Sequence, residues 1–180
     1  MIVFITGGAK NGKSSYAQEL AVQLAAGGKR YYIATMIPVD EEDRERIRRH
    51  IADRDGMGFE TVECGRDILS CLDRVNRHGS FLLDSATALL MNELFLPPDW
   101  RMDAAAGERC GDDIVTFARS VDNIVIVSDY IYSDAIRYDE TTETYRRLLA
   151  GIDRKIAGVS DVVLELSAGN RIVHKGEGLL

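Results

Sequence analysis

The sequence of 180 residues has few of the features that mark several common protein classes. Its three cysteines, Cys64, Cys71 and Cys110, match no metal-binding spacing and cannot all pair, so we expect reduced thiols. No apolar run approaches the ~20 residues of a membrane helix, and we expect no membrane span. Because the N-terminal residues lack the basic segment and cleavage site of a signal peptide, we expect a cytoplasmic protein.

Basic residues are in the minority, with 22 Lys and Arg against 29 Asp and Glu and a net charge of −7. This negative charge argues against non-specific binding to nucleic acid or to anionic membranes. The sequence has only three prolines, and we find no repeat or low-complexity tract that would mark a linker. We therefore expect a single domain over residues 1–180 with one sizeable core.

One stretch differs from this ordinary background, and we call it the phosphate loop: Gly7-Gly8-Ala9-Lys10-Asn11-Gly12-Lys13-Ser14. It has the pattern G-x-x-x-x-G-K-[ST], between an apolar run and a helical pattern. The glycines let backbone N–H groups turn toward phosphate oxygens, and the following helix adds its positive end. Lys13 is expected at the β- and γ-phosphates and the Ser14 hydroxyl at Mg²⁺. The alternative, an ordinary glycine-rich turn, is disfavoured by this context, so we predict a bound purine nucleoside triphosphate.

Apolar runs alternate with helical patterns along the rest of the chain. Strands are expected at residues 2–5, 31–34, 59–62, 81–84, 124–127, 162–166 and 171–174. Helices are expected at residues 14–26, 39–53, 67–77, 86–96, 104–120 and 143–157. The alternation predicts an α/β, three-layer fold of the P-loop NTPase type with a mainly parallel sheet, closed by an edge hairpin through Gly169-Asn170. Residues 97–100 are predicted to form an exposed loop, and residues 128–142 show no clear period.

Two side chains outside the phosphate loop are candidates for chemistry. Asp84 ends an apolar strand, where an acid commonly orients Mg²⁺ beside a phosphate loop; the alternative is a cap for the next helix. His50 lies one turn after Arg46 and beside Arg49, and cations there favour the neutral imidazole that can attack an α-phosphate. The residues alone favour the alternative for His50, a solvated side chain on a charged helix.

A resemblance to a known family changes that balance. The phosphate loop, Tyr32-Ile33-Ala34-Thr35, Asp40-Glu41-Glu42 and Arg46-Ile47-x-x-His50 together resemble the bifunctional adenosylcobinamide kinase/adenosylcobinamide-phosphate guanylyltransferase of cobalamin biosynthesis. Further matches are Thr61-x-Glu63, Leu83-Asp84-x-x-Thr87, Asn92, Tyr145-Arg146 and Lys175. The resemblance covers nearly the whole chain, and its most specific part is the phosphate loop followed by Arg-Ile-x-x-His.

The resemblance implies two reactions. The enzyme would first use ATP or GTP to phosphorylate the aminopropanol hydroxyl of adenosylcobinamide, a corrinoid. It would then transfer GMP from GTP to that phosphate through a guanylylated histidine, giving adenosylcobinamide-GDP. His50 matches the histidine and Lys13 the phosphate-loop lysine, with Mg²⁺ held by Ser14 and Asp84. Nucleotide contacts are expected at residues 7–14, Ala34, Thr35, Met36, Ile51, Ala52, Asp53, Arg54, Glu63 and Asp84. The family is oligomeric, and the resemblance favours a homotrimer.

The chain departs from the family after the strand that ends at Val127. Asp129 and Tyr130 stand where the family has Asn and Glu, and Asp153 replaces a later Asn. An amide can donate a hydrogen bond and a carboxylate cannot, so we expect the acceptor side of the site to differ. A kinase of a corrinoid or another small alcohol, without guanylyl transfer, is therefore an alternative. A non-catalytic regulator that switches residues 128–142 is disfavoured, because the guanine-reading Asn-Lys-x-Asp motif is absent.

Overall fold

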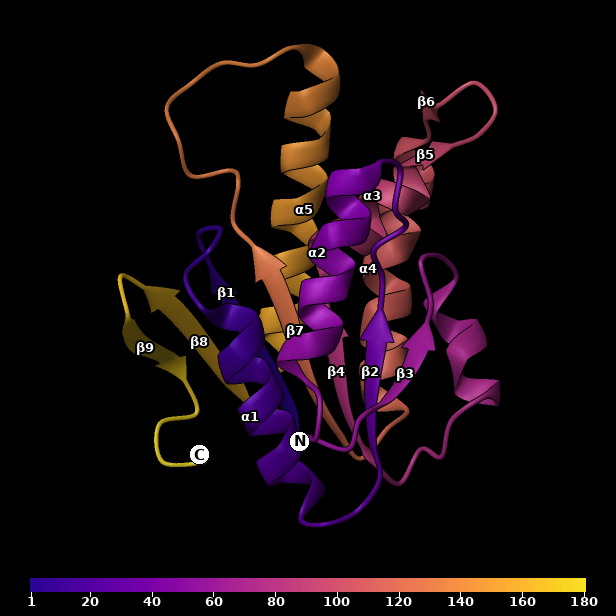
Figure 1. The fold of residues 1–180 in the computed structure, drawn as a ribbon. Coiled ribbons are helices and arrows are strands. Elements are labelled where there is room, and N and C mark those ends of the chain that lie inside the picture. The colour runs from indigo at the N-terminus through magenta and orange to yellow at the C-terminus, as the bar shows by residue number, and fades with distance from the viewer.

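The computed structural model describes residues 1–180 and consists of one sheet between two layers of helices (Figure 1). The sheet has seven strands in the order β3-β2-β4-β7-β1-β8-β9. Their bounds are β1 Ile2–Gly7, β2 Arg30–Ala34, β3 Glu60–Glu63, β4 Ser80–Asp84, β7 Asn123–Asp129, β8 Val162–Ser167 and β9 Asn170–Lys175. All neighbours are parallel except β8 and β9, which form the predicted antiparallel edge hairpin. The predicted α/β fold is confirmed.

Four of the five helices begin at a side chain that caps them, and the first begins instead at Gly12 of the phosphate loop. Their bounds are α1 Lys13–Ala25, α2 Glu41–Asp53, α3 Ala86–Leu94, α4 Ala104–Arg119 and α5 Glu140–Val159. Asp40, Ser85, Asp103 and Asp139 each accept a hydrogen bond from the backbone N–H three residues later. Each cap satisfies one N–H group that has no partner within its helix. None of the helices is long and apolar enough to cross a bilayer.

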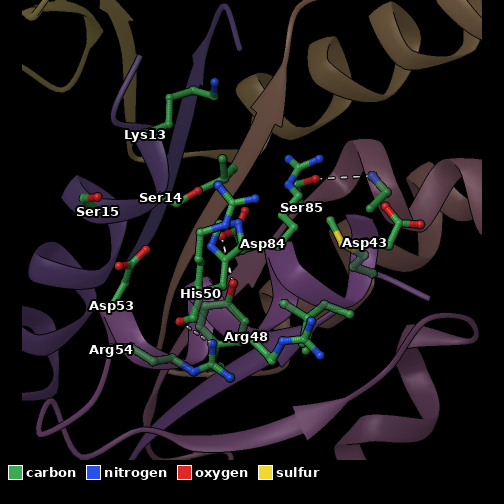
Figure 2. Close-up of a pocket in the computed structure, with 18 of the residues that line it drawn as sticks. Lys13, Ser14, Ser15, Asp43, Arg48, His50, Asp53, Arg54, Asp84 and Ser85 are labelled. Carbon is green, nitrogen blue, oxygen red and sulfur yellow. Dashed lines mark hydrogen bonds between the residues drawn. The ribbon is translucent and has the colours of Figure 1, made fainter. Parts of the chain in front are cut away.

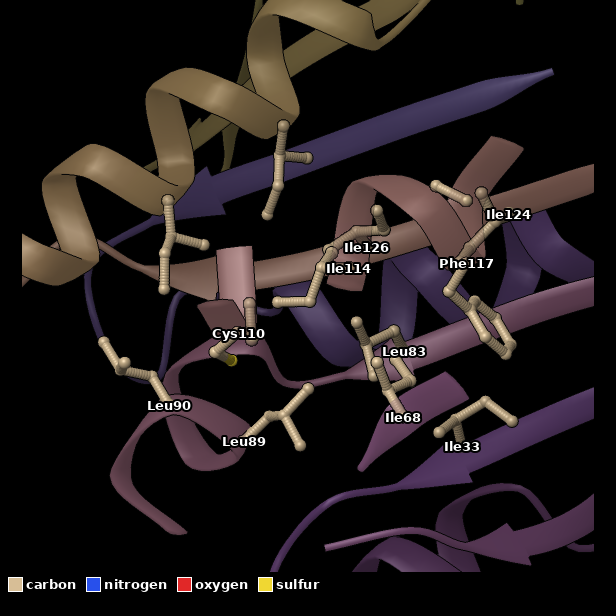
Figure 3. Close-up of a cluster of buried hydrophobic side chains, with 14 of the residues drawn as sticks. Ile33, Ile68, Leu83, Leu89, Leu90, Cys110, Ile114, Phe117, Ile124 and Ile126 are labelled. Atoms are coloured by element: carbon tan, nitrogen blue, oxygen red, sulfur yellow. The ribbon is translucent and has the colours of Figure 1, made fainter. Parts of the chain in front are cut away.

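Alternation along the strands sends neighbouring side chains to opposite faces of the sheet. Val3 and Ile5 of β1 pack against α1, whereas Phe4 faces the larger core formed with α3, α4 and α5. Figure 3 shows part of that larger core, in which Ile114 and Phe117 of α4 meet side chains of the central strands. Apolar burial on both faces fixes the parallel strands, and their carboxyl ends share one edge of the sheet.

The segment expected to be a helix at residues 67–77 is instead a short 3₁₀-helix, Ile68–Asp73. Ile68 and Cys71, three residues apart, are its buried side chains, a spacing that suits three residues per turn. The expected helix at residues 86–96 ends early, because Pro97-Pro98 cannot continue it. Strands β5 (Phe95–Leu96) and β6 (Arg101–Met102) pair there, and the exposed loop predicted at residues 97–100 connects them.

The expectation of three reduced thiols is also wrong. Cys64, directly after β3, and Cys71 of the 3₁₀-helix form a disulfide. The two cysteines come together because the short helix folds back toward the end of β3. Their spacing in the sequence does not predict this contact. Cys110 is a free, buried thiol, and burial raises its pKa to about 12.

Helix α5 carries a buried carboxyl group, Asp153, toward the sheet. Its side chain is only 4% exposed, and its Oδ1 has no hydrogen-bond partner. The Tyr132 hydroxyl donates to Oδ2 at 2.8 Å. Burial raises the pKa of this carboxyl from 3.8 to about 6, with a contribution from the charge of Asp129. The hydrogen bond that the carboxylate accepts from Tyr132 has the opposite effect on the pKa. At neutral pH the fold therefore contains an unfavourable negative charge in its interior.

Alanine substitutions at Gly7 and Gly12 test how closely the start of the phosphate loop packs against β8. A Cβ at Gly7 would clash with the carbonyl oxygen of Leu166 in β8, whereas a Cβ at Gly12 meets nothing within 4 Å and faces only an unfavourable φ of +79°. We expect Gly7→Ala to lower the free energy of unfolding by about 3 kcal/mol and Gly12→Ala by about 1 kcal/mol. Urea denaturation of both variants measures the difference. Equal losses would contradict the close packing of β1 on β8.

Asp153→Asn tests the buried carboxyl group. Because the folded-state pKa lies above the unfolded value, the wild type loses stability as pH rises from about 4 to 6. The amide does not ionise, so we expect the variant to gain up to about 3 kcal/mol relative to the wild type between pH 4 and pH 8. Urea denaturation at both pH values measures this gain. A difference between the two proteins that does not change with pH would refute it.

Candidate active site

A cavity of about 770 Å³ opens at the carboxyl edge of the sheet. The phosphate loop, α2 and the ends of β2, β4 and β7 line it, and Figure 2 shows its polar side chains. Its volume is within the range of small-molecule sites. The cavity therefore brings together segments from the first, middle and later parts of the chain.

The phosphate loop bends through left-handed backbone at Lys10 (φ +60°) and Gly12 (φ +79°) before α1 begins at Lys13. Residues Ala9 to Ser15 line the cavity, whereas Gly7 and Gly8 do not. The Lys13 side chain is 5% exposed; its Nζ donates to the Gly8 carbonyl at 2.6 Å and lies 2.6 Å from Asp129 Oδ1. The lysine is thus held at the cavity by the loop and by a carboxylate at the end of β7.

Asp84 lies at the end of β4 and lines the same cavity. The Tyr32 hydroxyl donates to Asp84 Oδ2 at 2.9 Å and fixes the carboxylate. The pKa of Tyr32 is raised, mainly by burial and also by the Asp84 charge. Asp84 does not cap α3, because Ser85 performs that role by accepting a hydrogen bond from the Ala88 N–H. This excludes the capping alternative for Asp84.

Ser14 and Asp84 both reach the cavity and fit a magnesium ion. Mg²⁺ is usually held by one or two carboxylates together with substrate phosphates, and P-loop proteins add a hydroxyl. One carboxylate oriented by Tyr32 and one hydroxyl at a helix N-terminus provide that set of ligands. The residues present are therefore suitable for Mg²⁺ bound with a nucleotide.

Helix α2 brings His50 to the cavity, so it is not a freely solvated side chain (Figure 2). Its Nδ1 is buried and has no hydrogen-bond partner. Arg54 fastens this end of α2 to the sheet: it donates to the His50 carbonyl at 2.7 Å and to Thr61 Oγ1 at 3.0 Å. Its guanidinium also stacks 4.1 Å from the centre of the Tyr32 ring. The position of His50 therefore depends on contacts with β2 and β3.

Arginines of α2 give this wall of the cavity a positive charge. Arg48 pairs with Glu41 and Glu45 at 2.7 and 2.8 Å. Arg46 and Arg49 also line the cavity but form no ion pair, so they remain available to an anion. The cavity thus has two cationic sides, one at Lys13 and the other beside His50. This arrangement suits a polyphosphate that extends from the loop toward the imidazole.

The other predicted contacts are not all at the cavity. Ala34, Met36, Asp53, Arg54 and Glu63 line it. Ile51 and Ala52 do not, because the turn of α2 that directs its neighbours inward points them away. Thr35 is fully buried, and its hydroxyl exchanges hydrogen bonds with the backbone of Ser85 at 2.8 and 3.0 Å. It supports the turn after β4 instead of facing the cavity.

Sequence reasoning named Asp129, Tyr32 and Arg46 but did not assign them as contacts at the nucleotide site, which they line. Asp129 ends an apolar strand, as Asp84 does, and that position could have identified it. Arg46 precedes His50 by one helical turn, which places the two on one face. Tyr32 lies inside a strand pattern, and only the fold directs its hydroxyl to Asp84. These three therefore enter the site through geometry.

The residues at which the chain departs from the family that it resembles lie near one another beside the phosphate loop. Tyr130 follows β7, and its hydroxyl donates to Glu165 Oε1 of β8 at 3.0 Å. His174 Nε2 of β9 lies 2.9 Å from the other oxygen of Glu165. Asp129 pairs with Lys13, and the buried Asp153 of α5 is close enough to be affected by its charge. The departures thus lie on the phosphate-loop side of the cavity, away from the wall that α2 provides.

Comparisons with known proteins support the resemblance. The sequence profile described as "Cobinamide kinase / cobinamide phosphate guanyltransferase" matches residues 3–173. The bifunctional adenosylcobalamin biosynthesis protein CobU of Salmonella typhimurium is 28% identical over 94% of this chain and 97% of its own length. CobU of Escherichia coli K12 is 24% identical over the same shares. The matches extend over nearly the whole chain.

Solved structures support the fold alone. A solved ATPase domain superposes with a TM-score of 0.53 at 13% identity, covering 98% of this chain and 77% of that one. The KaiC-like protein PH0186 of Pyrococcus horikoshii gives 0.51 at 14% identity, covering 98% and 79%. With the profile match, the expected resemblance is confirmed: this chain belongs to the cobinamide kinase/cobinamide phosphate guanyltransferase family.

Proposed function

We propose that this protein phosphorylates adenosylcobinamide with ATP or GTP and then transfers GMP from GTP to the new phosphate, giving adenosylcobinamide-GDP. The main observation in support is that the phosphate loop and His50 line one cavity. A kinase needs only the first of these, whereas transfer of a nucleotide through a histidine needs both. A homo-oligomer, with a trimer favoured by the resemblance, and a cytoplasmic location complete the proposal.

In the kinase reaction the phosphate loop binds the nucleotide through its backbone N–H groups, and Lys13 neutralises the β- and γ-phosphates. The acceptor hydroxyl attacks the γ-phosphorus, and the bond to the bridging β–γ oxygen breaks. Mg²⁺, bound by Ser14 and Asp84, would offset charge on the phosphates. Tyr32 keeps the Asp84 carboxylate oriented toward the cavity.

In the second reaction the imidazole of His50 attacks the α-phosphorus of GTP, and pyrophosphate leaves. No protein group hydrogen-bonds the buried Nδ1, so the ring is not committed elsewhere. Arg46 and Arg49 stand beside it without ion-pair partners and are suited to the charge on the α-phosphate. The phosphate of the corrinoid then attacks the guanylyl phosphorus, the P–N bond breaks, and His50 is restored.

The guanylyl-histidine is the intermediate that distinguishes this function from a kinase alone. We expect GTP labelled at the α-phosphate to leave acid-labile, alkali-stable label on the protein, and His50→Ala to abolish it. The label is measured on the denatured protein after removal of free nucleotide. Addition of adenosylcobinamide phosphate is expected to discharge it as adenosylcobinamide-GDP.

His78→Ala is the matched control, because His78 is an exposed histidine that does not line the cavity. It is expected to retain the label in full. A wild-type protein that phosphorylates adenosylcobinamide but takes no label would leave the kinase-only alternative. Tight GTP binding with neither reaction would point instead to the non-catalytic regulator.

Tyr32→Phe tests the orientation of Asp84. Loss of the hydroxyl removes the hydrogen bond to Oδ2, and groups that orient a metal ligand typically contribute ~10-fold or more to metal affinity. We expect the Mg²⁺ concentration that half-saturates the kinase reaction to rise about tenfold. Tyr31→Phe is the control, since the Tyr31 hydroxyl accepts from the Asn76 N–H on the other face of β2. Equal Mg²⁺ dependence in all three proteins would refute this role of Tyr32.

A further inference from the structure

The pairing of β7 with β1 places a second carboxylate at the phosphate loop. Gly7 and Asp129 are directly opposite each other in the register, and Asp129 lines the cavity. Its backbone N–H donates to Thr87 Oγ1 at 2.9 Å, which fixes the residue at the end of the strand. The side chain is 24% exposed, so it is accessible from the cavity.

Lys13 is the only group that pairs with the Asp129 carboxylate in the structure, at 2.6 Å. The same ammonium is expected to bind the β- and γ-phosphates of a nucleotide. When it turns to the phosphates, the Asp129 carboxylate loses this partner, and its place opposite Gly7 leaves it on the phosphate-loop side of the cavity, where the phosphates are expected. Asp153 and Tyr145, the other titratable groups close to Asp129, are buried in α5 and carry no positive charge.

A bare carboxylate beside a polyanion is unfavourable unless something positive or a proton donor comes between them. The acceptor hydroxyl is such a donor, because it must approach the γ-phosphorus from the open side of the cavity. Asp84 already provides the carboxylate for the metal, on β4, which is separated from β1 by β7. Asp129 is therefore free for a different role, next to the reacting hydroxyl.

We propose that Asp129 is the catalytic base of the kinase step, an inference that rests on the proposed function. The acceptor oxygen attacks the γ-phosphorus, the bond from that phosphorus to the β–γ bridging oxygen breaks, and the hydroxyl proton passes to an Asp129 oxygen. The products are a phosphate monoester and a nucleoside diphosphate, and the proton is released to water afterwards. The resemblance gives an asparagine at this position, which cannot take the proton, so this role would be particular to the present chain.

Asp129→Asn separates this role from that of a simple partner for Lys13. The amide keeps the size and hydrogen-bonding oxygen of the side chain but cannot accept a proton. We expect kcat for phosphorylation of adenosylcobinamide to fall about 10²-fold, the lower end of what a general base contributes, because the resemblance implies that an amide at this position still allows the step. Guanylylation of His50 by GTP transfers no hydroxyl proton, so at saturating GTP we expect its rate to fall far less than the rate of the kinase step. The ratio of the two rates in the variant, compared with that ratio in the wild type, measures the effect on proton transfer.

The matched control is Asp112→Asn. Asp112 pairs with Lys155 at the same 2.6 Å on the exposed surface of α4 and α5, away from the cavity. It is expected to leave both reactions unchanged. The control measures the effect of removing one carboxylate from a lysine ion pair that lies outside the cavity.

Two outcomes would overturn the assignment. If Asp129→Asn keeps kcat for the kinase step and lowers KM for the nucleotide, the carboxylate only competes with phosphate for Lys13. If excess Mg²⁺ restores kcat, Asp129 holds the metal and takes no proton. A wild-type protein that does not phosphorylate adenosylcobinamide would instead refute the proposed function, so the two failures are distinguishable.

Discussion

The site is built around β1, which lies parallel to both of its neighbours, β7 and β8. This pairing brings the carboxyl ends of three strands to one edge, and it lets the backbone of Gly7 approach Leu166 too closely for a side chain. The phosphate loop leaves the sheet from this point and runs into α1. Burial of β1 on both faces keeps its direction fixed, and that direction sets where the loop begins.

A second constraint places the imidazole. Helix α2 has no buried residue, so apolar packing does not hold it. Its end is instead held by Arg54, through the carbonyl of His50, the hydroxyl of Thr61 and the ring of Tyr32. Tyr32 in turn orients Asp84. One aromatic side chain of β2 thus links the histidine wall of the cavity to its carboxylate wall.

The chain has the Arg-Ile-x-x-His motif of the family at α2, but differs from the family pattern in residues beside the phosphate loop. The carboxylates Asp129 and Asp153 replace amides, and each is accommodated differently: Asp129 by the charge of Lys13, and Asp153 by a raised pKa of about 6. Tyr130 reaches β8 through Glu165. These contacts lie on the phosphate-loop side of the cavity and give it a more acidic and aromatic character than the resemblance implies.

Local spacing and apolar periodicity were enough to predict the phosphate loop, the alternation of strands and helices, the edge hairpin and the position of Asp84 at a strand end. His50 could be identified only through a resemblance, because one histidine on a charged helix has no distinctive pattern. The 3₁₀-helix in place of a longer helix, the Cys64–Cys71 disulfide and the meeting of Lys13 with Asp129 became visible only in the folded chain. The last two join groups that are brought together only by folding, and no local pattern encodes such distances.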